Sequence, residues 1–176
     1  PRADRSRPAS GWRLRAEPYE VEDLVNQRFA NSILSRYSTS TKEIIPLSTT
    51  LTVASLIQRE TIGTDDMRLV SGIIWNRIFQ DMNLQLDATL QYARGKTDKG
   101  WWSPIKSADK AIDSPYNTYR VAGLPPTPIS NPGLTAILAA LHPAETQCIF
   151  YLHGSDRKIH CSRTYAEHLK NIEKYL

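Results

Sequence analysis

Cysteine is scarce in this 176-residue sequence, which has only two residues of that type. Two cysteines are too few for the disulfide scaffold of a small secreted domain, and Cys148 and Cys161 lack the CxxC spacing that is typical of metal sites. We therefore expect two half-buried free thiols. They can pair only if the strands that carry them are neighbours.

Other absences exclude further classes of protein. No apolar run is long enough to span a membrane, and the sequence does not open with a signal-peptide pattern. If the parent protein has an anchor or an export signal, we expect it outside these residues. No group of His, Cys, Asp or Glu has metal-ligand spacing, and no glycine-rich phosphate-binding loop occurs. We therefore expect no metal and no cofactor.

Positive charge is present in only modest excess, with a formal net charge of +4. The basic residues cluster at the start of the chain, among Pro, Ser and Asp: Arg2, Arg5, Arg7, Arg13 and Arg15. Such a run is usually a solvated tail, and no base-stacking or groove-reading motif accompanies it, so we expect no nucleic-acid partner. A weak attraction to anionic polymers or lipid headgroups stays open.

Length and composition indicate one globular domain. Hydrophobic residues make up 40% of the sequence and charged residues 23%, and the length suits one compact core better than two. Residues 1–18 lack an apolar period and are interrupted by Pro1, Pro8 and Pro18. We interpret them as an N-terminal arm or a boundary segment that precedes a domain over residues 19–176.

Helical spacing of apolar residues predicts two helices in the first third of the chain. Residues 20–33 have the pattern of an amphipathic helix. Residues 47–61 contain an almost continuous apolar stretch at their centre: Leu51, Val53, Ala54, Leu56 and Ile57. The second segment therefore predicts a deeply buried helix, with Ser48, Thr49 or Thr50 as its N-cap.

The following segments predict a third helix and a short strand. Thr64 or Asp65 can cap a helix that runs to about Phe79 and turns one stripe of aliphatic residues toward the core: Val70, Ile73, Ile74 and Ile78. Leu84 and Leu86 then alternate with polar neighbours as in a short strand, and another helix can start near Ala88.

The rest of the chain predicts an α+β domain in which helices pack around a small antiparallel sheet. Prolines from Pro115 to Pro128 impose a rigid, irregular path that suits the wall of a binding groove. A helix follows and ends at Pro143. Residues 148–152 and 158–162 have the pattern of a hairpin, and residues 164–176 that of a final amphipathic helix.

Glu60 is the most informative position for chemistry. It lies three and four residues after Ile57 and Leu56, so it shares their buried helix face. A carboxyl group packed against hydrocarbon loses hydration, and its pKa rises toward the working pH, as a glycosidic general acid requires. The alternative is an ordinary glutamate at a helix end that reaches solvent. The local pattern leaves both open.

A series of motifs points to one family. The segment Leu51–Thr61 is followed by Trp75-Asn76-Arg77, Leu84–Thr89, Ser114–Tyr119, Gly123–Pro126, Ile129–Gly133 and His160-Cys161-Ser162 with His168. In this order the motifs resemble those of the YceG-like (MltG) family of endolytic murein transglycosylases, and a series is far more specific than any single short pattern.

The resemblance implies that Glu60 is the catalytic residue of a lyase that needs no cofactor. Glu60 protonates the glycosidic oxygen after an N-acetylmuramic acid and then, as a base, helps the sugar's own C6 hydroxyl form a 1,6-anhydro end without water. The family typically has a second glutamate two residues earlier, where this sequence has Gln58. Gln58 points to nearly the opposite side of the helix, so we assign the catalytic role to Glu60 alone.

A set of polar and backbone-restricting residues is expected to bind the sugar: Gln85, Asp87, Thr89, Asn117, Tyr119, Gly123, Leu124, Pro125, His160 and Ser162. Asp87 can instead cap the helix near Ala88. We interpret His168 as a packed or capping histidine. For Trp101 and Trp102 we expect that they pin their loop to the domain, with stacking on a sugar ring as the alternative.

The resemblance also implies partners and a location. Peptidoglycan glycan strands are the expected substrate, and nascent strands are expected to end where the enzyme cuts. Peptidoglycan synthases are a further class of partner that the resemblance admits. The parent protein is expected to be membrane-anchored at the extracytoplasmic face of the bacterial membrane. Two competing functions are a muramidase, in which Asp87 activates water opposite Glu60, and a non-catalytic peptidoglycan-binding module.

Overall fold

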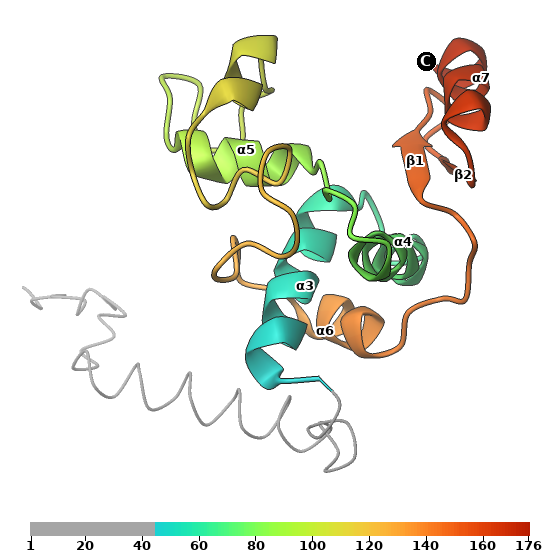
Figure 1. Ribbon diagram of the computed structural model, residues 1–176, viewed down its shortest axis with the longest axis horizontal. Helices are drawn as coiled ribbons and strands as arrows, with labels where there is room; N and C mark the ends of the chain where they lie inside the picture. The colour runs from blue at the N-terminus through green and yellow to red at the C-terminus, as the bar shows by residue number, and fades with distance from the viewer. Residues whose placement is uncertain (1–44) are drawn as a thin grey trace, which may run out of the picture. The chain divides into compact units, whose positions relative to one another are not determined.

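The computed structural model describes residues 45–176. The expected arm over residues 1–18 and the expected helix over residues 20–33 lie outside this range. Within it, the chain forms five α-helices, one 3₁₀-helix and one two-stranded antiparallel sheet, which confirms the α+β class (Figure 1). No helix in the described range has the length and apolarity needed to cross a membrane.

Helix α3 (Leu47–Glu60) is the centre of the core, and it packs against α4, α5 and α6. Its predicted burial is confirmed, because its inner face is fully shielded from solvent: Val53, Ala54, Leu56 and Ile57. The predicted N-cap is wrong. Pro46 occupies that position, and Ser48, Thr49 and Thr50 lie inside the first turn, where the hydroxyl of Thr50 bonds the Pro46 carbonyl instead.

Helices α4 (Met67–Phe79) and α6 (Leu134–Leu141) complete the helical layer around α3. The N-cap of α4 is Asp66, one residue beyond the predicted capping pair. Its predicted stripe is buried at Val70, Ile73 and Ile74 and less so at Ile78. Helix α6 ends before Pro143, as its sequence predicts, and buries mainly small residues, which allows close packing.

The predicted strand at Leu84 and Leu86 is wrong. Both leucines are buried, but Gln85 between them has a φ of 54°, which an extended strand excludes. The backbone N–H of Gln85 donates to the carbonyl of Thr118, so the segment pairs with a loop rather than a strand. Helix α5 (Asp87–Arg94) starts directly after this turn, and the 3₁₀-helix η2 (Ser107–Ala111) packs beside it.

The C-terminal part forms the predicted hairpin and final helix. Strands β1 (Phe150–His153) and β2 (Ile159–Ser162) pair antiparallel, with Tyr151 opposite Cys161. Helix α7 (Tyr165–Tyr175) packs against both strands. Thr164 caps it by accepting the Glu167 N–H, while the Glu167 carboxylate accepts the Thr164 N–H.

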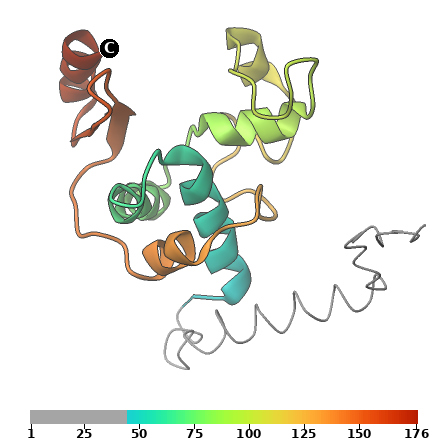
Figure 2. The same cartoon turned by 180° about the vertical axis from the view of Figure 1, so that it is seen from behind.

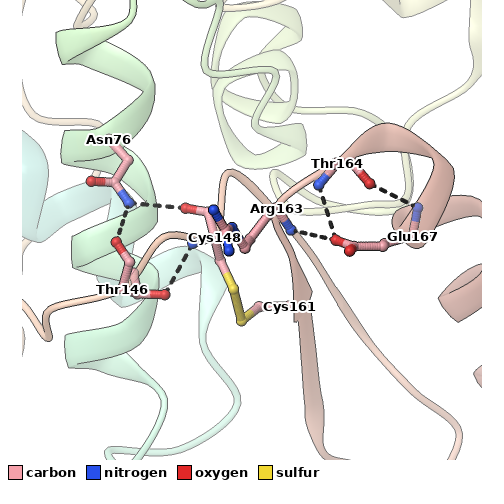
Figure 3. The surroundings of a disulfide bond; sticks show 7 residues. All are labelled: Asn76, Thr146, Cys148, Cys161, Arg163, Thr164 and Glu167. Carbon is pink, nitrogen blue, oxygen red and sulfur yellow. Dashed lines mark hydrogen bonds between the residues drawn. A yellow bond between two sulfur atoms is a disulfide. The ribbon is translucent and has the colours of Figure 1, made fainter.

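A disulfide joins Cys148 and Cys161, so the expectation of two free thiols is wrong (Figure 3). Cys148 lies two residues before β1 and Cys161 lies in β2, which brings the two Cα atoms to 5.8 Å. The side-chain amide of Asn76 in α4 donates to the carbonyls of Thr146 and Cys148. The base of the hairpin is thereby tied to α4.

Two small groups of elements lie on either side of the C-terminal end of α3. Figure 1 shows α5 and η2 on one side and β1, β2 and α7 on the other, and the same arrangement is seen from behind in Figure 2. Glu60 is the last residue of α3. The fold therefore places this carboxyl group where both groups of elements can supply neighbours.

Candidate active site

A cleft of about 320 Å³ lies at the C-terminal end of α3. Its walls come from α3, α4, the turn before α5, the first residue of α5, the loop that carries Tyr119, strand β1 and helix α7. The lining residues are Glu60, Ile73, Ile74, Arg77, Leu84, Gln85, Leu86, Asp87, Tyr119, Phe150, Tyr151, Tyr165 and His168. The volume is near the lower end of small-molecule sites. Polar and aromatic side chains from four distant parts of the sequence thus meet around one glutamate.

The carboxyl group of Glu60 is held by two hydrogen bonds. Its Oε2 accepts the hydroxyl of Tyr151 at 2.8 Å, and its Oε1 accepts the backbone N–H of Ala88 at 3.3 Å. Burial raises the pKa of Glu60 above its ordinary value of 4.5, and the negative charge of Asp87 acts in the same direction, while the two hydrogen bonds oppose the rise. The result is a fixed carboxyl group that keeps its proton to a higher pH than a solvated one.

Tyr151 is the main functional candidate that the sequence analysis missed. It lies in β1, 91 residues beyond Glu60, and its side chain is on the strand face opposite the buried Leu152. Burial and the neighbouring Glu60 raise the pKa of the Tyr151 hydroxyl well above its ordinary value, so it stays a proton donor in its hydrogen bond. The alternation of side chains in the predicted strand is the one sequence feature that bears on which way Tyr151 points. It does not show that the phenol hydroxyl bonds Glu60.

Asp87 and Tyr119 form a second polar pair in the cleft. The hydroxyl of Tyr119 donates to Oδ1 of Asp87 at 2.5 Å, and burial together with this bond raises the pKa of Tyr119 above its ordinary value. Asp87 does not cap α5, because it is the first helical residue and Leu86 is the N-cap. The capping alternative is therefore wrong. Gln85 also lines the cleft, so three predicted sugar-binding residues lie beside Glu60.

Two other predicted sugar-binding residues are used inside the fold instead. Asn117 is fully buried, donates to the carbonyls of Lys110 and Ile112, and accepts the N–H of Tyr119. Thr89 is also fully buried, and its hydroxyl bonds the Leu86 carbonyl and Thr118. Their hydrogen-bonding groups hold the cleft-lining loops in place rather than face the cleft.

The remaining predicted residues do not line the cleft. Gly123 has a φ of 84° and precedes Leu124 and Pro125 in an irregular segment. None of these three residues lines the cleft. His160 stacks on Tyr175 and bonds Asp156, and Ser162 is buried at the end of β2. The roles proposed for these residues in substrate binding stay predictions.

Gln58 faces away from the cleft, as expected, and its Oε1 accepts the N–H of Gly133 before α6.

The guanidinium of Arg59 lies 3.8 Å from the ring centre of Trp102, which fits the interpretation that this tryptophan pins its loop. Trp101 is 48% exposed. His168 packs on the ring of Phe150, as expected of a packed histidine, and it also contributes to the cleft wall.

No group of three or more metal-ligating side chains is found in residues 45–176. The polar groups that line the cleft are carboxyl, phenol, amide, guanidinium and imidazole groups. Proton transfer is the chemistry that this set supports, with Glu60 as the group whose proton affinity is best adjusted for it.

Comparison with known proteins finds relatives of this chain in one family. The family model described as "YceG-like family" matches residues 14–174. The chain is similar to an endolytic murein transglycosylase of Bacillus subtilis, with 35% identity over 89% of this chain and 43% of that protein. It is also similar to an endolytic murein transglycosylase of Streptococcus pneumoniae, with 28% identity over 95% of this chain and 33% of that protein.

A solved structure shows the same fold. The crystal structure of a putative yceG-like protein from Listeria monocytogenes superposes with a TM-score of 0.77 and 33% identity, covering 86% of this chain and 48% of that one. The chain spans less than half the length of each of these relatives. Because the family model covers nearly the whole sequence, the chain belongs to the YceG-like family.

Proposed function

We propose that this chain is the catalytic part of an endolytic lytic transglycosylase that cuts peptidoglycan glycan strands. The observation that carries the proposal is the Glu60 carboxyl group, fixed in the cleft by Tyr151 and Ala88 and with its pKa raised by burial. The names of the two curated relatives support the same activity. Since the chain spans less than half of either relative, the activity of the whole protein is part of the proposal.

In the proposed reaction, Glu60 acts first as an acid and then as a base. Its proton passes to the glycosidic oxygen that follows an N-acetylmuramic acid, and the bond from that oxygen to the anomeric carbon breaks. The C6 hydroxyl of the same sugar attacks the anomeric carbon and gives its proton to the Glu60 carboxylate. The product is a 1,6-anhydro end, and the tethered nucleophile reacts at a high effective concentration, so no second carboxylate and no water are needed.

The surroundings of Glu60 support both halves of this cycle. The two hydrogen bonds stabilise the carboxylate formed after the first proton transfer, while burial raises the pKa of Glu60 and so favours the protonated acid. Asp87 and Tyr119 offer an acceptor and a hydroxyl to the sugar at the same cleft. We further propose that the parent protein acts on nascent strands beside peptidoglycan synthases, anchored at the extracytoplasmic face of the membrane.

A muramidase is the second candidate, because Asp87 lies in the same cleft and can activate water. Mass spectrometry of digested glycan separates the two reactions. A transglycosylase gives anhydro ends, whereas a muramidase gives reducing ends that are one water heavier. Reducing ends as the main product would replace the proposed reaction with hydrolysis.

The test of the catalytic residue is Glu60→Gln in the full-length protein, with Glu173→Gln as a matched control on the exposed side of α7. The amide keeps the shape of the side chain but cannot donate and then accept the proton. We expect no anhydro product from the first variant and wild-type amounts from the second. Cleavage by Glu60→Gln at more than a few per cent of the wild-type rate would remove Glu60 from this role.

A further inference from the structure

Arg77 is a buried cation at the wall of the cleft, near the C-terminal end of α4. The residue is only 9% exposed, yet it lines the cleft. Its Nε donates to the carbonyl of Ile149 at 2.6 Å, and its Nη1 donates to the carbonyls of Asn83 and Leu84 at 3.1 and 2.7 Å. These bonds fix the plane of the guanidinium and link α4 to the turn before α5 and to the start of β1.

The third nitrogen of this guanidinium is left without a partner. Within residues 45–176, Nη2 makes no hydrogen bond and Arg77 makes no ion pair with a carboxylate. Three carbonyl oxygens orient the group but do not neutralise its charge. Burial also lowers the pKa of Arg77, because removal from water disfavours the charged form. A buried, fixed cation of this kind gains most from an anion that supplies the missing partner.

The neighbours of Arg77 in the cleft leave its charge uncompensated. Its guanidinium carbon lies 5.2 Å from the ring centre of Phe150, and the ring of His168 stacks on Phe150 with a distance of 5.4 Å between ring centres. Burial and the charge of Arg77 lower the pKa of His168, which favours the neutral imidazole. Of the acidic groups in the cleft, Asp87 accepts the Tyr119 hydroxyl and forms no ion pair with Arg77, and the raised pKa of Glu60 favours its neutral form.

We propose that Nη2 of Arg77 binds a carboxylate of the substrate beside Phe150 and His168, and so selects the muramic acid side of the glycan. This inference rests on the proposed function. N-acetylmuramic acid differs from N-acetylglucosamine by a lactyl ether, which carries a carboxylate in a peptide-free strand and a stem peptide with carboxylates of its own in a substituted one. Both sources offer the same chemistry to a guanidinium, whose hydrogen bonds to carboxylates are among the stronger ones in proteins.

The experiment measures binding in a Glu60→Gln background, so that turnover does not interfere. One pair of probes is a peptide-free tetrasaccharide of alternating N-acetylglucosamine and N-acetylmuramic acid, with the lactyl group either as free acid or as methylamide. The second pair is the same tetrasaccharide with stem peptides, whose carboxyl groups are either free or amidated. Calorimetry gives the Kd of each probe.

We expect the free acid of one pair to bind about tenfold tighter than its neutral partner, as a charged hydrogen bond allows. Preference within the first pair identifies the lactyl carboxylate, and preference within the second identifies the stem peptide. Arg77→Gln in the same background should abolish the preference. Arg68→Gln is the matched control, since Arg68 is also in α4 and also bonds a carbonyl, that of His142, but lies outside the cleft.

The proposal fails if the Glu60→Gln protein binds acid and neutral probes equally in both pairs. This outcome needs no Arg77 variant, so it decides the matter even if Arg77→Gln does not fold. It is also separate from the proposed function, because a protein that binds without charge preference can still lose all cleavage with Glu60→Gln. Preference that persists in a folded Arg77→Gln variant would likewise assign the carboxylate to another residue.

Discussion

Tyr151→Phe is the sharpest test of how the site adjusts its acid. The variant removes the hydroxyl that donates to Oε2 of Glu60 at 2.8 Å and leaves the ring in β1. This hydrogen bond favours the carboxylate and therefore lowers the pKa of Glu60 against the effect of burial. Without it, the Glu60 pKa rises further. The variant should keep its acid protonated to a higher pH than the wild type.

The size of the effect follows from the two states of the acceptor. A hydrogen bond contributes about 1.5–3 kcal/mol with a charged partner and about 0.5–1.5 kcal/mol with a neutral one. The difference is about 1–1.5 kcal/mol, which corresponds to about one pKa unit. The high-pH limb of kcat/KM, which reports the acid of the free enzyme, should therefore move up by about one pH unit. The plateau should fall by up to about tenfold, because one of the two bonds that orient the carboxyl group is gone.

The assay is the release of anhydro ends from purified glycan strands, measured from acid to alkaline pH for the wild type and the variant. Tyr116→Phe is a suitable control, because its hydroxyl bonds Thr127 and it lies outside the cleft. A lower plateau with an unmoved limb would show that Tyr151 only packs against Glu60. A limb that moves to lower pH would contradict the sign of the argument and the assignment of Glu60 as the titrating acid.

Three further predictions concern single positions. The pKa of Glu60 is raised in the folded state, so folding takes up a proton above pH 4.5. The stability of the wild type should therefore fall as the pH rises from 4.5 through the folded-state pKa. Glu60→Gln should remove this pH dependence when melting temperatures are measured across the same range. Gln58→Glu should leave the rate of anhydro-end formation unchanged, because Gln58 faces away from the cleft, and a large gain would show that a second carboxylate contributes. Gly123→Val should lower the free energy of unfolding by about 1–3 kcal/mol in urea, because a φ of 84° strains a β-branched residue. Gly123→Asn should lie closer to the wild type, and equal stability of all three proteins would refute the strain argument.

The helices were predictable because their apolar residues recur along one face. The periodicity over residues 47–61 depends only on which side of α3 meets the core, and the structure buries that side. Caps and short strands depend on a few backbone dihedrals instead. Pro46 rather than a hydroxyl residue begins α3, and the positive φ of Gln85 interrupts a segment whose leucines alternate in the sequence as they would in a strand.

The candidate site was predictable only in part. Some polar residues of the motifs line the cleft and others hold the loops in place, and the sequence does not separate the two. Asp87 and Tyr119 come from motifs of the family and line the cleft. Asn117 and Thr89 come from the same motifs but hold the loops with buried hydrogen bonds. An amide or hydroxyl suits a sugar and a backbone carbonyl equally well, so only the fold shows which partner it has.

The role of Tyr151 could not be predicted for a related reason, and the disulfide is part of it. Its hydroxyl meets Glu60 only because the hairpin is fixed relative to α4, and that position depends on contacts between distant residues. Cys161 lies directly opposite Tyr151 in β2 and is bonded to Cys148, whose carbonyl accepts the amide of Asn76 in α4. Arg77, one residue further along α4, bonds the Ile149 carbonyl just before β1. The chain therefore positions the hydrogen-bond donor of its candidate acid through covalent and polar links that join β1 to β2 and both to the helix beside the cleft.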